Sequence, residues 1–125
     1  MTRLFPATAD FTGSLYKPAR FEGEIYDLEV DGIVPDEIDG TFFQVAPDPQ
    51  YPPMLGDDIF FNGDGAITAF TFKNGHVDFK RRYVMTERLK AQRAARASLH
   101  GIYRNRYTND PSVRELNNST ANTNV

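Results

Sequence analysis

The amino-acid sequence predicts an all-β fold with one inserted helix. Ten phenylalanines and six tyrosines in 125 residues favour strands, because aromatic side chains pack well on the half-buried surface of a sheet. Asn74-Gly75 separates two β-prone runs, which is typical of a tight hairpin. One stretch after Thr86 is instead rich in helix-forming residues. The chain is long enough for one small domain with its own core.

The N-terminal part is predicted to form an arm followed by two strands. Residues 1–20 mix Pro6, Gly13 and Pro18 with scattered polar residues, as expected of an extended arm laid over a larger body. Residues 21–30 alternate only partly between apolar and polar, which predicts a strand with a bulge or a change of face. Residues 41–45 are the second strand. The proline-rich residues 47–53 follow as a loop, because proline cannot donate ladder hydrogen bonds.

The hairpin is the best-defined element of the sequence. Residues 66–73 and 76–84 are both β-prone, and they are joined by Asn74-Gly75. Asparagine and glycine tolerate the positive φ angles that a type I′ turn requires. Residues 21–84 are therefore predicted as strands that close in this hairpin.

One helix is predicted within residues 86–100. Thr86 offers an N-cap oxygen, and Glu87 places a negative charge in the first turn. Residues 87–99 are rich in Leu, Ala, Gln, Lys and Arg, and Gly101 would stop the helix. Residues 101–125 are predicted as loop, and their polar end from residue 117 has by itself the composition of disordered sequence.

The net charge of −3 conceals a segregation of charge along the chain. Residues 1–79 carry 4 basic and 14 acidic side chains, a net charge of −10, whereas residues 80–106 carry 9 basic and 1 acidic, a net charge of +8. A basic cluster of this kind is one signature of a nucleic-acid or acidic-membrane surface. The favoured interpretation is a solvated basic helix that faces acidic strands of the same protein, because no aromatic residues are interleaved with the basic ones between Arg88 and Arg96.

The absence of cysteine from the sequence excludes disulfides and thiolate chemistry and fits a reducing compartment. The first residues lead into no long apolar run, so the sequence predicts neither a signal peptide nor a transmembrane helix. We therefore expect a cytoplasmic protein with no membrane span.

Closely spaced glycines make residues 61–65, the glycine loop, a candidate for chemistry. A phosphate cradle would need a lysine and a following helix, and a calcium loop would need alternating oxygen ligands with a bidentate glutamate. Neither pattern is present. The favoured interpretation is a tight turn at the entrance to a strand, which Gly63 and Gly65 would allow to be strained, with Asp64 accepting backbone hydrogen bonds.

His76 and His100 are the two histidines of the chain. His76 follows the hairpin turn and is predicted to be a solvated turn residue. His100 stands at the predicted helix end, where it would interact with the helix dipole. No metal ligand is assigned to this chain, because a metal site usually needs several converging ligands. No Ser/His/Asp set is present that would form a nucleophile and base, and no catalytic residue is assigned.

In order and spacing, several segments resemble the N-terminal part of the carotenoid cleavage oxygenase family, and more closely its lignostilbene- and resveratrol-cleaving branch. These segments are GIVPDEIDGTFF at 32–43, APDP at 46–49, FFNGDGAITAFTF at 60–72 and RYVMTER at 82–88. The resemblance runs from about residue 29 to residue 125. Many family members carry Arg, Gly, Asn and Asp where this chain has Gln44, Ala46, Asp48 and Asn62. These departures resemble the stilbene-cleaving branch and argue against a long polyene substrate.

The resemblance implies that residues 1–125 are an incomplete N-terminal portion of a seven-bladed β-propeller. It also implies an iron(II)-dependent dioxygenase that cleaves the alkene of a phenolic stilbene into two aldehydes. The four histidines that hold iron in the family would lie beyond Val125, so we expect the chain alone to be inactive. In the family, the glycine loop borders the substrate cavity, which gives Phe61 a role as an apolar wall. GIYRN at 101–105 matches the position of a tyrosine that contacts the para-hydroxyl of the substrate, which is Tyr103 here.

The expected partners are therefore a small aromatic alkene and O₂, with no nucleic acid and with the oligomeric state left open. A carotenoid or apocarotenoid substrate is an alternative that keeps the enzyme class. Two alternatives of other classes are a non-enzymatic interaction fragment with a basic helix and a basic nucleic-acid binder.

Overall fold

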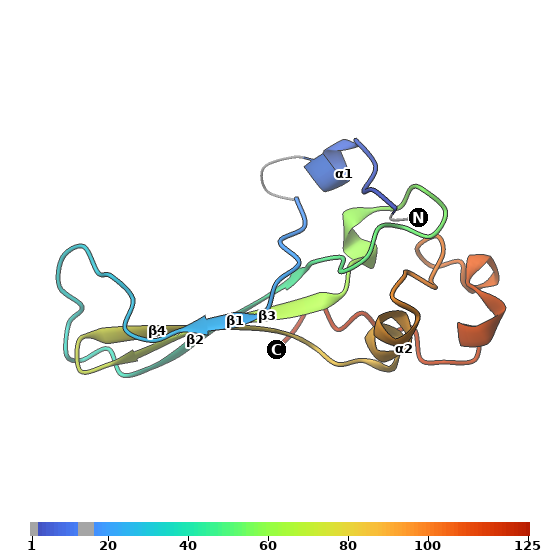
Figure 1. The fold of residues 1–125 in the computed structure, drawn as a ribbon. Helices are drawn as coiled ribbons and strands as arrows, with labels where there is room; N and C mark the ends of the chain where they lie inside the picture. Colours follow the sequence, from blue (N-terminus) through green and yellow to red (C-terminus); the bar gives the residue numbers. More distant parts are fainter. Residues whose placement is uncertain (1–2, 13–16) are drawn as a thin grey trace.

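The computed structural model describes residues 3–12 and 17–125, and its centre is a four-stranded antiparallel sheet. The strands follow the order β1-β4-β3-β2 across the sheet. Their bounds are β1 Gly23–Ile25, β2 Gly40–Pro47, β3 Gly65–Lys73 and β4 His76–Tyr83. Figure 1 shows the sheet as an elongated ribbon, with helix α2 and the C-terminal turns gathered beyond one end of it. The strand-rich fold class predicted from the sequence is confirmed.

The predicted hairpin is present with the expected turn. All of β4 pairs with β3 from Ala66 to Lys73, and Lys73 lies opposite His76 across the turn. Asn74 and Gly75 both have positive φ, 50° and 78°, as a type I′ turn requires. Phe70 pairs with Phe79 across the two strands, and their ring centroids are 5.5 Å apart.

The first two strands differ from the prediction in length. β2 runs to Pro47 and pairs with β3 throughout, so the strand predicted for residues 41–45 is present and longer. β1 has three residues, and the strand predicted for residues 21–30 is wrong beyond Ile25. Asp27 adopts a left-handed conformation with φ of 59°, and its N–H donates to the Asp78 carboxylate instead of continuing the ladder.

Helix α2, Glu87–Ala95, begins where the sequence predicts and ends earlier. The Thr86 hydroxyl accepts a hydrogen bond from the Leu89 N–H and caps the first turn. The predicted continuation to residue 99 is wrong, because Arg96 adopts the left-handed conformation with φ of 54°. Its N–H donates to the Arg93 carbonyl and closes the helix, so a non-glycine residue ends the helix five residues before Gly101.

Short helical turns occupy the regions that the sequence assigns to the arm and the loops. The arm contains helix α1, Ala9–Thr12, and so is not extended throughout; its residues 1–2 and 13–16 lie outside the described part. In the described part of the chain, three 3₁₀ turns follow: η1 Phe60–Asn62, η2 Arg106–Thr108 and η3 Pro111–Val113. Across the ranges 3–12 and 17–125, no helix is long and apolar enough to cross a bilayer.

The segregated charges meet within the chain. Each of the following ion pairs joins a basic residue of segment 80–106 to an acidic residue of segment 1–79: Arg81–Asp48 at 2.5 Å, Arg93–Glu22 at 3.2 Å, Arg82–Glu24 at 3.4 Å, Arg88–Asp64 at 3.6 Å and Lys80–Glu24 at 3.7 Å. The basic segment therefore faces acidic residues of the same protein, as the favoured interpretation predicts. The helix is not solvated throughout, however, because Arg88 is 4% exposed, and Lys80, Arg81 and Arg82 make their ion pairs from β4.

The apolar core is small and lies where α2 meets the root of the hairpin. Leu89 of α2, Ala66 of β3 and Tyr83 of β4 form its buried cluster. In contrast, Phe42 and Phe43 of β2 are 59% and 52% exposed. Because neighbouring strand residues point to opposite faces, β2 leaves apolar surface uncovered on both faces of the sheet.

Candidate functional site

The glycine loop is held by close packing rather than by an unusual backbone conformation. Gly63 has φ of −69°, and neither Gly63 nor Gly65 is among the positive-φ glycines, so the strain that these glycines would have allowed is absent. A Cβ on Gly63 would lie 2.7 Å from the Pro49 ring, and one on Gly65 would lie 2.0 Å from the Ala121 carbonyl oxygen. Both distances are shorter than van der Waals contact. These positions need glycine because other segments pack directly against them.

Asp64 is buried at the centre of this packing. Its side chain accepts hydrogen bonds from the Gln50 N–H at 3.2 Å and from the Gln92 amide at 3.1 Å. The backbone contact confirms the predicted role of Asp64, whereas nothing in the sequence indicated its partners on α2. Burial raises the pKa of the Asp64 carboxyl, and the positive charge of Arg88 partly opposes this shift.

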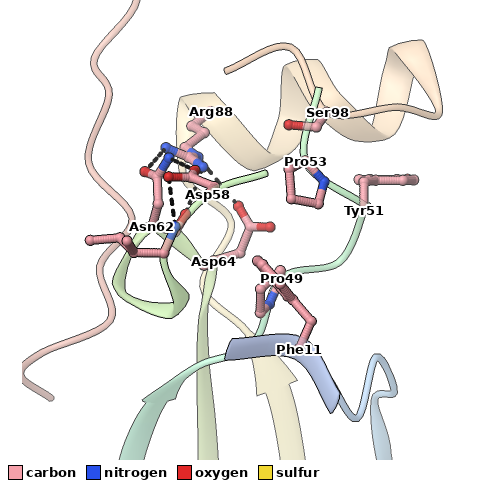
Figure 2. Close-up of a pocket in the computed structure, with 11 residues that line it drawn as sticks. Phe11, Pro49, Tyr51, Pro53, Asp58, Asn62, Asp64, Arg88 and Ser98 are labelled. Carbon is pink, nitrogen blue, oxygen red and sulfur yellow. Dashed lines mark hydrogen bonds and ion pairs between the residues drawn. The ribbon is translucent and has the colours of Figure 1, made fainter. Parts of the chain in front are cut away.

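Arg88 is the buried positive charge that faces Asp64. Its Nε lies 3.6 Å from Asp64 Oδ1, and its Nη atoms donate to the Asn62 carbonyl at 2.7 Å and to the Asn62 side chain at 2.9 Å. Figure 2 shows Arg88 reaching from α2 towards Asn62, Asp58 and Asp64. Burial lowers the pKa of the guanidinium, and the neighbouring carboxylates oppose this shift.

His100 is buried next to this group, and its predicted role at the helix end is wrong. α2 ends at Ala95, and the chain then folds back so that His100 is 2% exposed with Nδ1 3.2 Å from Gln92 Oε1. Burial and the charge of Arg88 lower the pKa of His100 to about 4. The imidazole is therefore neutral at neutral pH. We call Asn62, Asp64, Arg88, Gln92 and His100 together the Arg88 cluster.

The cavity beside the Arg88 cluster is too small for an aromatic ligand. It is lined by Phe11, Pro49, Tyr51 and Pro53 together with Asp64 and Arg88, among others (Figure 2). Its volume is about 20 Å³. That space holds about one water molecule. The cavity itself therefore cannot hold an aromatic ligand, and the contacts of the cluster are structural.

Tyr103, predicted to contact the substrate, lines an open surface hollow of about 610 Å³. The hollow also contains Ile59, Ile102, Asp57 and Asp58. Its volume falls within the range of small-molecule sites. Tyr103 is 38% exposed, and its N–H donates to Asp58 Oδ1 at 3.2 Å. The Arg104 guanidinium lies 5.3 Å from the centre of its ring.

Phe61, the second predicted contact, is 64% exposed in turn η1. It does not line the hollow that contains Tyr103. The Asn122 amide donates to the carbonyls of Phe61 at 2.8 Å and Gly63 at 2.9 Å, which fixes the backbone on both sides of Asn62. The polar tail, read from composition as disordered, is thus tied to the glycine loop.

The sequence did not point to the residues that connect Phe61 and Tyr103 to the rest of the fold. These residues are Asp58, Asn62, Arg88 and Asn122. Arg88 and Gln92 are four residues apart and so share one helix face, which was a usable signal for a buried polar surface on α2. The sequence held no comparable signal for Asp58, because its partner is 45 residues away.

Comparisons with known proteins identify the family. Residues 16–125 match the sequence profile of the family described as retinal pigment epithelial membrane protein. Over 97% of its length, the chain is 51% identical to lignostilbene-α,β-dioxygenase isozyme III of Sphingomonas paucimobilis, covering 24% of that protein. The chain belongs to this carotenoid oxygenase family.

Two further relatives are a resveratrol cleavage oxygenase and a lignostilbene dioxygenase of known structure. It is 49% identical to resveratrol cleavage oxygenase 1 of Chaetomium globosum over 97% of the chain and 20% of that protein. The structure superimposes on that of Pseudomonas brassicacearum lignostilbene dioxygenase with a TM-score of 0.92 and 58% identity, over 96% of the chain and 25% of that structure. The chain thus spans about a fifth to a quarter of the length of these relatives.

The residues of this chain do not fit the four-histidine iron site implied by the family. His76 is exposed and lies 2.6 Å from Asp27 beside the hairpin, whereas His100 is buried against Gln92. Within the described ranges, no three histidine or acidic side chains gather where they would share a metal ion.

Proposed function

We propose that the full-length protein is a dioxygenase that cleaves the central double bond of a phenolic stilbene of the lignostilbene or resveratrol type. The observation that carries this proposal is the 51% identity to a lignostilbene dioxygenase over 97% of the chain, together with the TM-score of 0.92. In the proposed reaction, the C=C bond breaks and each carbon receives one oxygen atom of O₂. One alkene and one O₂ therefore yield two aldehydes.

Iron(II), as implied by the family, would supply the activation of O₂. We place its four histidine ligands beyond Val125 and outside this chain. The contribution of this chain is then to bind and orient the substrate. On its own it is proposed to be inactive.

Phe61 and Tyr103 are the proposed substrate contacts. The exposed Phe61 ring offers an apolar wall for an aromatic ring. Tyr103 would contact the para-hydroxyl of the substrate from the surface hollow. Loss of the proton from the para-hydroxyl pushes electron density into the alkene and favours its reaction with oxygen. By orienting this hydroxyl, Tyr103 would therefore act on the activated form of the substrate.

The proposed architecture of the full-length protein is a seven-bladed β-propeller, of which this chain forms the N-terminal portion. The exposed Phe42 and Phe43 and the open edge of β2 support this proposal, because further strands and blades would cover such surfaces.

The function is tested by supplying the full-length protein with Fe(II), O₂ and 4,4′-dihydroxystilbene. We expect two molecules of 4-hydroxybenzaldehyde for each stilbene consumed. The 125-residue chain, assayed in parallel, is expected to form none. Turnover of an apocarotenal without turnover of the stilbene would contradict the proposed substrate class while keeping the reaction type.

Replacing Tyr103 with phenylalanine removes the hydroxyl and keeps the ring, so the shape of the hollow is preserved. A charge-assisted hydrogen bond contributes about 1.5–3 kcal/mol. We therefore expect kcat/KM for the phenolic stilbene to fall about tenfold to somewhat over a hundredfold. A stilbene without the hydroxyl, measured in the same two proteins, is expected to lose little. Equal losses on both substrates would assign Tyr103 to packing.

A further inference from the structure

We propose that Asp58 is a positioning residue that holds Tyr103 in place for the substrate hydroxyl. This inference rests on the function proposed above. Asp58 Oδ1 accepts hydrogen bonds from the Ile59 N–H at 2.8 Å and from the Tyr103 N–H at 3.2 Å. Asp58 Oδ2 accepts a hydrogen bond from the Asn62 amide. One carboxylate thus joins the segment before η1 to the segment that carries Tyr103.

The hydrogen bonds that join Asp58 and Asn62 to the Tyr103 segment connect residues far apart in the sequence, whereas the bonds within that segment connect near neighbours. The N–H groups of Gly101 and Ile102 donate to Asn109 and Thr108, which lie in the same loop and move with it. In contrast, Asp58 is 45 residues from Tyr103, and the Asn62 amide donates to the Gly101 carbonyl at 3.0 Å. These long-range bonds tie the start of the loop, at Gly101 and Tyr103, to the segment around η1.

The Arg88 cluster makes this anchor rigid. Two Nη atoms of Arg88 hold the carbonyl and the side chain of Asn62, and Asn62 in turn orients Asp58. Asp58 lines both the buried cavity next to Arg88 and the open hollow that contains Tyr103. It therefore lies at the boundary between the fixed interior and the proposed binding surface, as Figure 2 shows for the interior side.

Asp58 acts through Tyr103 in this proposal and does not itself contact the reacting atoms. Loss of the carboxylate would leave the Tyr103 N–H without its acceptor, and the phenol of Tyr103 would then occupy a wider range of positions. The consequence should be selective, because a substrate without the hydroxyl makes no use of that position. A general support of the fold would instead affect both kinds of substrate alike.

The experiment compares Asp58→Ala with Asp58→Asn in the full-length protein, using 4-hydroxystilbene and its 4-methoxy counterpart. We expect Asp58→Ala to lower kcat/KM for the phenol about tenfold, which is roughly the effect of losing one hydrogen bond. For the ether, we expect kcat/KM to fall about twofold or less. Asp58→Asn keeps one oxygen for the Tyr103 N–H and should retain more activity on the phenol than Asp58→Ala.

Asp110→Ala is the matched control. Asp110 is also an acidic side chain that accepts backbone N–H donation, from Ser112 at 2.9 Å, and it lies in the same C-terminal segment as Tyr103. It contacts η3 and not the glycine loop, so we expect both substrates to be cleaved at the wild-type rate within about twofold.

Amide hydrogen exchange at Tyr103 gives a readout that does not need turnover. Asp58→Ala should accelerate exchange at Tyr103, whereas Asp110→Ala should not. Unchanged exchange, or equal losses on the phenol and the ether, would overturn the positioning role. If the wild-type protein cleaves neither stilbene, the proposed function fails together with the substrate part of this inference, and accelerated exchange would still establish the link from Asp58 to Tyr103.

Discussion

Replacing Arg88 with methionine is expected to lower the local stability of α2 and the glycine loop by about 3–5 kcal/mol. Arg88 is 4% exposed and faces Asp64, which is 3% exposed. Methionine fills much of the space but leaves the Asp64 carboxylate buried without a counter-charge and the Asn62 carbonyl without its donor at 2.7 Å. Native-state hydrogen exchange of α2 amides in the full-length protein measures the loss.

The loss should depend on pH in a defined direction. Burial already raises the pKa of Asp64 from 3.8, and Arg88 opposes that rise, so removal of Arg88 raises the pKa further. A raised pKa in the folded state stabilises the fold below the unfolded pKa, and this contribution disappears as pH rises through the folded pKa. Arg88→Met should therefore be least damaging at acidic pH, where Asp64 is neutral, and most damaging once Asp64 ionises.

Two variants distinguish a buried charge from a general packing defect. Arg93→Met changes the same residue type on the same helix, but Arg93 pairs with Glu22 where both side chains are about one-third exposed. Its cost should be about 1 kcal/mol or less. Adding Asp64→Asn to Arg88→Met removes the stranded charge and should recover part of the loss. Equal effects of Arg88→Met and Arg93→Met would contradict the buried-charge account.

The parts of the fold that the sequence predicts are those in which the deciding interaction is local. The Asn74-Gly75 turn needs only the two residues that adopt positive φ, and the α2 cap needs only Thr86 and the Leu89 N–H three residues later. The end of α2 was mispredicted because Arg96, a residue with no particular preference for the left-handed region, adopts the conformation expected of glycine.

The candidate site was harder to predict, because its contacts join distant segments. Gly65 looks like a flexible turn residue in the sequence, yet its role is to let the backbone at Ala121 approach. His100 looks like a helix-end residue, yet the early end of α2 carries it into the interior. Phe61 and Tyr103 came from family resemblance, and their link through Asp58 and Asn62 required the tertiary structure.

Replacing Leu89 with alanine is expected to destabilise the junction between α2 and the hairpin by about 2–5 kcal/mol. Leu89 is fully buried, at 0% exposure, and forms the apolar cluster with Ala66 and Tyr83. Truncation removes apolar contact and leaves a void that the neighbouring backbone cannot easily close. The backbone there is already fixed by hydrogen bonds such as Val84 N–H to the Gly65 carbonyl at 2.9 Å.

The matched control is Leu55→Ala, which makes the same truncation at a leucine that is 53% exposed. Its cost should lie within about 0.5 kcal/mol of zero, as for other surface substitutions. Amide hydrogen exchange should accelerate in Leu89→Ala both in α2 and at the end of the hairpin next to α2, because Leu89 contacts both elements. Amides near the Asn74-Gly75 turn should keep their local hydrogen bonds and their exchange rates. If exchange accelerated only in α2, the helix would be unfolding without the hairpin. That result would contradict the proposed role of Leu89 in joining the two elements. A loss below about 1 kcal/mol would mean that the small cluster is not the main attachment of α2 to the sheet.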